Sequence, residues 1–232
     1  MNIGVFTTLK VIDGIPLFWN MHQKRLIEQA KKLNLGEINI SVQNIRTYLQ
    51  KNNLTECALQ ITITKQNRLP ILSIQHRPLP QTSINYKLIT FDDKRNYRKI
   101  YKTTDRAVNE QAKKLAEETG ANDALFTTDK TIIESTIANV FSLDKKGEII
   151  TPPITKKGLN GITRQLIKRH GNIVETDIHQ NTKGPLVLVN CLRIQKVSHL
   201  NGKKLINGNV LLQKLQALLE QTEKEYFLTL SA

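Results

Sequence analysis

The sequence has few cysteines and few aromatic residues, and it lacks long apolar runs. Its two cysteines, Cys57 and Cys191, have no metal-ligand spacing and cannot form a disulfide framework, so we expect no metal site and a reducing, cytoplasmic environment. No window approaches the roughly 18 uninterrupted apolar residues of a transmembrane helix, so we expect no contact with a membrane interior. The N-terminus, MNIGVFTTLK, lacks a basic start followed by a long apolar run, so we expect no secretory signal.

Acidic residues are also scarce, since 20 Asp and Glu stand against 34 Lys and Arg and give a net charge of +14. A basic balance suits nucleic acid, an anionic membrane surface or small anionic ligands. The basic residues are scattered in pairs, and no zinc finger, aromatic RNA-binding signature or basic zipper accompanies them. We therefore favour solvated basic faces and a small anionic substrate over a nucleic-acid partner.

Residues 1–80 are typical of a small α/β domain. Two helices are expected, one capped by Asn20 and closed by Gly36, and a second capped by Ser41. Alternating apolar residues predict strands at residues 4–11, 57–63 and 72–74.

Prolines at positions 78 and 80 interrupt both helices and strands, so we place a linker at residues 81–84. Residues 85–232 then form a larger domain, and the whole chain is expected to be a two-domain α/β protein. Helices are predicted at about 105–118, from Gly161, and near the C-terminus. Strands are predicted near 86–90, 124–127, 131–134, 138–143, 148–150 and 185–189.

Four short patterns place reactive groups at the ends of these elements. His22 and Arg25 share one helix face, where a guanidinium can grip phosphate. Lys102 enters a helix among basic neighbours that favour its neutral amine, the form that reacts with an aldehyde. Glu134 ends an isoleucine-rich strand and needs a cationic partner, and Gly161 precedes a helix start that can bind an anion. Each pattern alone also fits a structural role: a helix face, a surface lysine, a salt bridge and a capped helix.

Together the patterns supply an amine, a carboxylate, an arginine and a helix start, the groups that pyridoxal 5′-phosphate (PLP) requires. Their order resembles that of the fold-type IV PLP enzymes, the class IV aminotransferase family. This resemblance covers nearly the whole chain and implies a small α/β domain followed by a pseudo-barrel domain with helices. The matching segments are His22-x-x-Arg25-Leu26, Lys102, Glu134, Asn139-Val140-Phe141, Thr151-Pro152-Pro153 and Leu159-x-Gly161-Ile162-Thr163-Arg164.

The resemblance implies roles for individual residues. Lys102 would be the catalytic residue, joined covalently to PLP and moving protons. Glu134 would pair with the ring nitrogen, and Arg25 would contact the phosphate. A homodimer is also expected from the resemblance. Further residues expected to contact the cofactor are Ala138, Asn139, Ile162, Thr163 and Cys191.

Two segments favour the 4-amino-4-deoxychorismate lyases within this family. Phe6-Thr7-Thr8 resembles their N-terminal strand, and Val189-Asn190-Cys191-Leu192-Arg193 resembles their Asn-Ser/Ala-Leu loop. Lys196-Val197 departs from the usual Pro-Val pair after that loop. The hypothesis is that pyruvate is eliminated and 4-aminobenzoate, a folate precursor, remains. Arg193, Arg98 and Lys99 are candidates to receive the substrate carboxylates, and Thr7 is a further candidate contact with the substrate.

Two alternatives remain open. The first is a branched-chain or D-amino acid aminotransferase of the same family, which would use the same cofactor. The second is a non-catalytic basic protein that binds nucleic acid, which would retain DNA or RNA in a salt-sensitive manner and would not be yellow.

Overall fold

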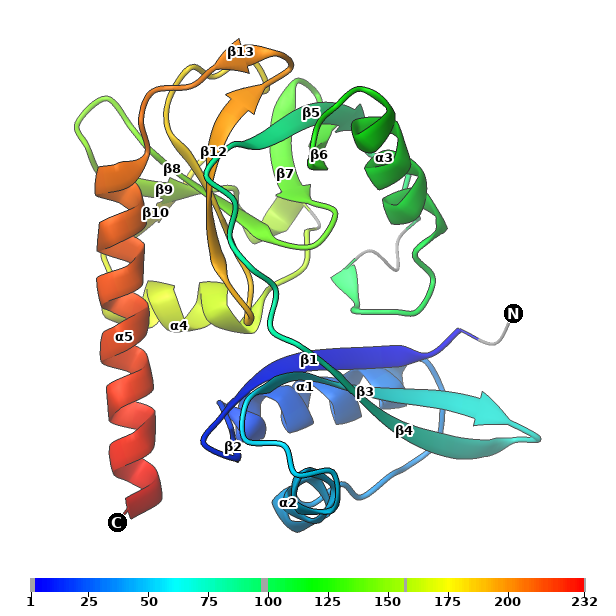
Figure 1. Ribbon diagram of the computed structural model, residues 1–232. Helices are drawn as coiled ribbons and strands as arrows, with labels where there is room; N and C mark the ends of the chain where they lie inside the picture. Colours follow the sequence, from blue (N-terminus) through cyan, green and yellow to red (C-terminus); the bar gives the residue numbers. More distant parts are fainter. Residues whose placement is uncertain (1–2, 97–99, 157, 232) are drawn as a thin grey trace. The chain divides into compact units, whose positions relative to one another are not determined.

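The computed structural model describes residues 3–96, 100–156 and 158–231 of the chain (Figure 1). Contacts group the chain into two units. Unit 1 comprises Met1–Pro80 and Tyr101–Asp105, and unit 2 comprises Gln81–Ile100 and Arg106–Ala232. The sequence-based division put residue 102 in the larger domain, whereas its contacts group it with unit 1. The expected mixed α/β class is confirmed.

Unit 1 is built on an antiparallel sheet with the strand order β2-β1-β3-β4. Asp13 and Gly14 both have positive φ angles, 52° and 73°, and form the tight turn between the first two strands. The elements of this unit are β1 (Val5–Ile12), β2 (Ile15–Pro16), α1 (Trp19–Lys32), α2 (Val42–Lys51), β3 (Cys57–Gln66) and β4 (Leu69–Arg77).

Helix α1 begins and ends differently from the prediction. Its N-cap is Phe18, whose left-handed backbone (φ 55°) already completes the turn from β2, so Asn20 lies inside the first turn. The predicted closure by Gly36 is also wrong. The left-handed residue just beyond the helix is Asn34 (φ 53°), one of the few non-glycine types that adopt this conformation readily.

Strand β1 directs one row of side chains into the core of unit 1. Val5, Leu9 and Val11 belong to this row, are fully buried, and pack with apolar residues of α1, α2 and β3. Thr7 is the polar member of the same row and is also fully buried. Its hydroxyl therefore needs a hydrogen-bond partner inside the protein.

Unit 2 is built on a mixed sheet with the order β10-β9-β8-β11-β12-β5-β6-β7, and β13 pairs with β12. Strand β5 runs parallel to both of its neighbours. The strands are β5 (Tyr86–Asp92), β6 (Asp123–Thr128), β7 (Thr131–Ser135), β8 (Asn139–Leu143), β9 (Ile149–Thr151), β10 (Ile173–Glu175), β11 (Leu186–Val189), β12 (Ile194–Leu200) and β13 (Lys203–Lys204). The helices are α3 (Ala107–Glu118), α4 (Ile162–His170) and α5 (Asn209–Ser231), with a 3-10 turn at Ile154–Lys156.

Helices pack on the sheet of unit 2, and polar groups lie at the ends of its strands. Ala112 and Ala116 of α3 lie against Phe126 of β6, while Leu211 and Leu215 of α5 pack with apolar residues of β8, β11 and α4 (Figure 1). These buried contacts fix the ends of β7 and β8 and the start of α4, where the candidate cofactor residues of this unit lie.

Candidate active site

Lys102 lies on an extended segment beside β1. Its carbonyl oxygen accepts a hydrogen bond from the Phe6 N–H at 2.9 Å, and its own N–H donates to Gln29 Oε1 at 3.0 Å. Thr103 forms an isolated β-bridge with Val5. The Lys102 Nζ lies 4.7 Å from the centroid of the Phe6 ring, a distance that allows a cation–π interaction. Strand β1 and helix α1 thus fix the backbone at Lys102.

Buried Thr7 and His22 form a polar group with half-buried Arg25 on the inner side of α1. Thr7 Oγ1 lies 2.7 Å from His22 Nδ1 and accepts a hydrogen bond from Arg25 Nη2 at 2.8 Å. Burial lowers the pKa of His22 well below its ordinary value, and the positive charges of Arg25 and Lys102 lower it further. His22 is therefore uncharged at neutral pH.

Glu134 ends β7 with a carboxylate that is held from two sides. The residue is 5% exposed, its Oε1 accepts a hydrogen bond from Arg95 Nη1 at 2.7 Å, and its Oε2 accepts one from the Leu159 N–H at 3.1 Å. Arg95 in turn donates two hydrogen bonds to Asp93, from Nε to Oδ1 at 2.9 Å and from Nη2 to Oδ2 at 3.0 Å. Its guanidinium lies 3.8 Å from the Phe126 ring centroid. The buried carboxylate thus has a fixed orientation and a cationic partner.

The turn that follows Glu134 is also fixed. Ser135 Oγ accepts a hydrogen bond from the Ala138 N–H at 3.0 Å, and the Thr136 carbonyl accepts one from Arg106 Nη2 at 2.8 Å. Arg106 is the N-cap residue of α3. Its guanidinium therefore ties the turn that carries Ala138 to the start of that helix.

The start of α4 lies beside the same strand ends. Asn139 Nδ2 donates to the Leu159 carbonyl at 2.8 Å, and a Cβ at Gly161 would lie only 2.1 Å from Asn139 Oδ1. Only glycine therefore fits at the N-cap, and no side chain caps the helix. Ile162 and Thr163, the first helical residues, are buried. Backbone N–H groups at such a helix start are suited to bind an anion.

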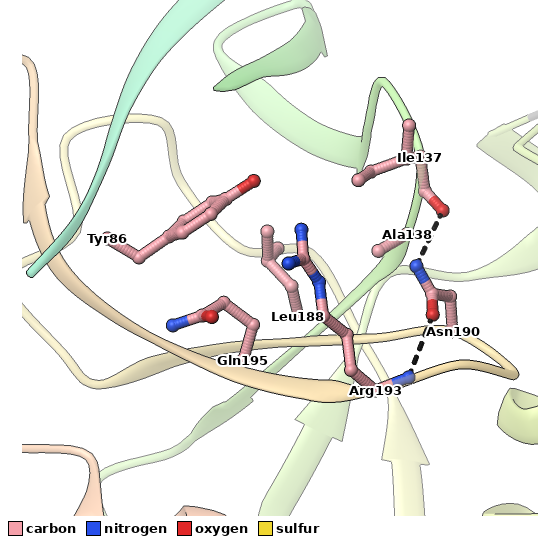
Figure 2. Close-up of a pocket in the computed structure, with 7 residues that line it drawn as sticks. All are labelled: Tyr86, Ile137, Ala138, Leu188, Asn190, Arg193 and Gln195. Carbon is pink, nitrogen blue, oxygen red and sulfur yellow. Dashed lines mark hydrogen bonds between the residues drawn. The ribbon is translucent and has the colours of Figure 1, made fainter. Parts of the chain in front are cut away.

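Figure 2 shows a small pocket in unit 2 where Arg193 points toward Tyr86 and the 137–138 turn. Asn190 orders the loop, since its Oδ1 accepts hydrogen bonds from two loop N–H groups, one of them that of Arg193 at 3.1 Å, and its Nδ2 donates to the carbonyl of the turn at 3.3 Å. Burial raises the pKa of Tyr86 to about 12. The pocket is lined by Tyr86, Ile137, Ala138, Leu188, Asn190, Arg193 and Gln195.

The residues predicted from the sequence divide between the two units. Thr7 and Arg25 are hydrogen-bonded to each other in unit 1, which also contains Lys102. Arg98 and Lys99 lie outside the described residues. Cys191 is half-buried and is not among the residues that line the pocket of Figure 2. Unit 2 holds the remaining predicted residues, Glu134, Ala138, Asn139, Ile162, Thr163 and Arg193.

Comparison with known families decides what kind of protein these groups belong to. A sequence profile of the family described as amino-transferase class IV matches residues 4–183, most of the chain. The chain belongs to this family. The match includes every predicted cofactor residue except Cys191.

Solved structures share the fold of this class IV chain over nearly its full length. The crystal structure of a candidate 4-amino-4-deoxychorismate lyase from Legionella pneumophila subsp. pneumophila str. Philadelphia 1 is 25% identical, with a TM-score of 0.84, and the match covers 95% of this chain and 91% of that one. The PLP-bound form of a hypothetical aminotransferase from Mycobacterium tuberculosis is 20% identical, with a TM-score of 0.80 and coverage of 95% and 88%.

The curated relatives that match this chain are longer than it is. The D-alanine aminotransferase of Staphylococcus haemolyticus is 25% identical over 184 residues, which is 71% of this chain and 64% of the relative. The match thus spans 64% of that relative's length, which is less than two thirds.

Within residues 3–96, 100–156 and 158–231, no group of three or more His, Cys, Asp or Glu side chains could hold a metal ion. Over the same part of the chain, no helix is long and apolar enough to cross a membrane.

Proposed function

We propose that this chain is a PLP-dependent 4-amino-4-deoxychorismate lyase, which forms 4-aminobenzoate and pyruvate in folate biosynthesis. The likeness to the Legionella structure carries the proposal, because its identity, TM-score and coverage of the other chain, 25%, 0.84 and 91%, all exceed those of the match to the M. tuberculosis aminotransferase. Phe6-Thr7-Thr8 and the loop at 189–193 support it, because both segments resemble the lyases of the family more than its aminotransferases.

The described residues of unit 2 fit the ring and phosphate of PLP. The start of α4 has no side-chain cap, and Gly161 leaves room for Asn139 to hold the preceding loop by its backbone. Glu134 presents a buried carboxylate whose two oxygens already accept hydrogen bonds from N–H groups. Such a carboxylate suits the protonated nitrogen of a pyridine ring.

In this proposal each polar group has one task. When bound, PLP draws electrons from the carbon that bears the substrate amine and so makes its proton acidic. Lys102 holds the cofactor, takes that proton at Nζ, and later delivers a proton to the methylene carbon of the departing enolpyruvate. Glu134 keeps the ring nitrogen protonated, while Arg25 and the N–H groups of Ile162 and Thr163 bind the phosphate.

The reaction is balanced without a further reactant. The C–O bond between the ring and the enolpyruvyl group breaks, the ring loses one C–H proton and becomes aromatic, and the enol takes up one proton to become pyruvate. Because aromatisation drives the elimination, the protein has to position groups and move protons.

The substrate carries two carboxylates, and we assign cationic side chains to receive them. Arg193 lies in the pocket of Figure 2, where Tyr86 and Asn190 hold its loop and side chain. Arg98 is the second side chain proposed to receive them, whereas Thr7 is fully buried and its hydroxyl is already bonded to His22 and Arg25. We also propose a homodimer, which sedimentation equilibrium of the purified chain would test.

The direct test is incubation of the PLP-loaded protein with 4-amino-4-deoxychorismate and measurement of 4-aminobenzoate and pyruvate. We expect both products in equal amounts and their loss in Lys102→Ala. Lys113→Ala is the matched control, because that lysine is partly exposed on α3 and pairs with Glu117. Products that survive Lys102→Ala would contradict the proposal.

A D-amino acid aminotransferase is the second candidate, supported by the likeness to D-alanine aminotransferases. It predicts that D-alanine alone shifts the cofactor absorbance to shorter wavelength and releases pyruvate. A lyase should do this poorly, so the two substrates distinguish the candidates.

A further inference from the structure

The buried group of Thr7, His22 and Arg25 contains an imidazole to which the proposed reaction gives no task. His22 is 1% exposed and Thr7 is fully buried. Thr7 Oγ1 lies within hydrogen-bond distance of both His22 Nδ1, at 2.7 Å, and Arg25 Nη2, at 2.8 Å. The hydroxyl therefore links the imidazole to the guanidinium.

The direction of these hydrogen bonds follows from the protons that each group carries. A guanidinium can only donate, so Thr7 Oγ1 accepts from Arg25. The hydroxyl proton of Thr7 then needs an acceptor, and the acceptor within reach among the described residues is His22 Nδ1. The opposite tautomer, with its proton on Nδ1, would leave two buried groups without a partner, the Thr7 hydroxyl proton and the Nε2 lone pair, whereas a proton on Nε2 leaves only that N–H without one.

The charges around His22 exclude its protonated form. Arg25 lies three residues along the same helix, Lys102 lies on the segment beside β1, and the positive charges of both disfavour a protonated imidazole. His22 Nε2 is buried and has no hydrogen-bond partner in the described part of the chain. A second proton would therefore add a positive charge beside two others, with no carboxylate bonded to it.

We propose that His22 is a positioning residue: it stays uncharged, carries its proton on Nε2 and accepts the Thr7 hydroxyl proton at Nδ1, so that Thr7 Oγ1 holds the guanidinium of Arg25. The tautomer and the bond to Thr7 do not depend on the cofactor. The consequence for phosphate rests on the proposed function, because it takes Arg25 as a ligand of the PLP phosphate. In this arrangement the imidazole neither moves a proton nor adds charge near Lys102.

The tautomer is tested by nitrogen NMR of the cofactor-free chain labelled with 15N-histidine. We expect His22 Nε2 to bear the proton and Nδ1 to have the shift of an acceptor nitrogen from about pH 6 to pH 8, the range in which an ordinary histidine changes charge. A proton on Nδ1, or protonation of both nitrogens within this range, would overturn the proposal.

The effect on Arg25 is tested by comparing the affinities for PLP and for pyridoxal, which lacks the phosphate. Losing the buried acceptor in His22→Leu should weaken PLP binding about fivefold to tenfold and pyridoxal binding less than about twofold. His22→Asn, which places a carbonyl oxygen near the position of Nδ1, should keep PLP affinity within about threefold. Thr7→Val should resemble His22→Leu, and the double variant should be no weaker than either single one.

The matched control is Thr62→Val, the same isosteric change on strand β3, where Thr62 pairs with Phe6 and makes no side-chain hydrogen bond among the described residues. Equal losses for PLP and pyridoxal, or no rescue by His22→Asn, would overturn the link from His22 to Arg25. If the unchanged protein binds neither compound, the proposed function fails, while the NMR result still decides the tautomer and the bond to Thr7.

Discussion

Glu134 lies at one end of a buried series of charges that runs from Asp93 through Arg95. The guanidinium contacts the carboxylates of Asp93, at 2.9 Å, and Glu134, at 2.7 Å, and its flat face lies on Phe126. Asp93 keeps Arg95 in one orientation, so the cation meets Glu134 from a fixed side. The orientation of the Glu134 carboxylate is therefore set by the protein before any ligand contributes.

Arg95→Met should lower the free energy of unfolding by about 3–5 kcal/mol, because it leaves buried carboxylates without their cation. Urea denaturation measures the change. Lys113→Met is the control, because its i,i+4 partner Glu117 is exposed and the pair should contribute less than about 1 kcal/mol. Similar losses in both variants would contradict the account of Arg95.

Gly161→Ala should weaken PLP binding, because the added Cβ meets Asn139 Oδ1 at 2.1 Å and displaces the loop before α4. Overpacking of this kind costs about 1–3 kcal/mol, so titration with PLP should show a loss of roughly fivefold or more. Gly208→Ala is the control, since its Cβ would make only ordinary contacts, 3.4 Å or longer. Unchanged affinity in Gly161→Ala would show that this loop does not hold the cofactor.

The site residues that could be predicted from the sequence belong to patterns of neighbouring residues. Arg25 stands three positions after His22, and Gly161 precedes a helical pattern, so both could be found from local rules. Asp93 and Arg95 were missed, because a charged cluster after a strand is usually solvated. No local pattern reports that Arg95 contacts a carboxylate 39 residues further along the chain.

Among the helices and strands, local sequence rules predicted an element correctly where its capping residues or its apolar alternation gave a clear signal. Ser41 forms a reciprocal capping box with Asn44 at the start of α2, as its cap position predicted. Strand β12 was not predicted, because Gln195 and Lys196 interrupt its apolar alternation. Gln195 is nevertheless buried, and its side chain bonds both the N–H and the carbonyl of Ser83, so tertiary hydrogen bonds replace the missing apolar signal.

Glu175, at the end of β10, forms ion pairs with Arg164 and Lys168 of α4. We expect this contact to be lost in acid. Burial raises the pKa of this carboxyl, but hydrogen bonds from Lys168 and the Ile154 N–H, with the charge of Arg164, outweigh burial and lower the pKa to about 2. Since the folded-state pKa lies below the ordinary value of 4.5, the stabilisation is present above about pH 4.5 and is lost as the pH falls toward 2.

Glu175→Gln should therefore destabilise the protein at neutral pH and flatten the fall in stability over this acidic range. Urea denaturation at a series of pH values checks both effects. Glu148→Gln, an exposed change near the same strands, is the control. A variant whose stability runs parallel to that of the unchanged protein at every pH would contradict the assignment.

At the scale of the whole molecule, the charge of +14 is the feature that a small anionic substrate would meet first. Under the proposed function, kcat/KM for 4-amino-4-deoxychorismate should fall several-fold as salt shortens the Debye length from about 30 Å at 0.01 M to about 8 Å at 0.15 M. Steady-state kinetics in sodium chloride measure this slope. An uncharged co-solvent of matched viscosity is the control, and an insensitive kcat/KM would show that the charge does not steer substrate.

The division of the chain into units also marks the limit of prediction from sequence. The mixed α/β class follows from periodicity, because each unit has its own alternating strands and amphipathic helices. The membership of Lys102 in unit 1 does not follow from periodicity, because it depends on the backbone of Tyr101–Asp105 pairing with β1. Long-range backbone pairing of this kind has no local signature.

The proposed function requires that one amine in this chain, that of Lys102, bonds to the aldehyde of PLP. Reduction of the PLP-treated protein with borohydride, followed by peptide mass spectrometry, identifies the amine that has reacted. We expect a single major phosphopyridoxyl group on the peptide that contains Lys102, and none on that peptide in Lys102→Arg. Label distributed over surface lysines, with residue 102 unmodified, would contradict the account.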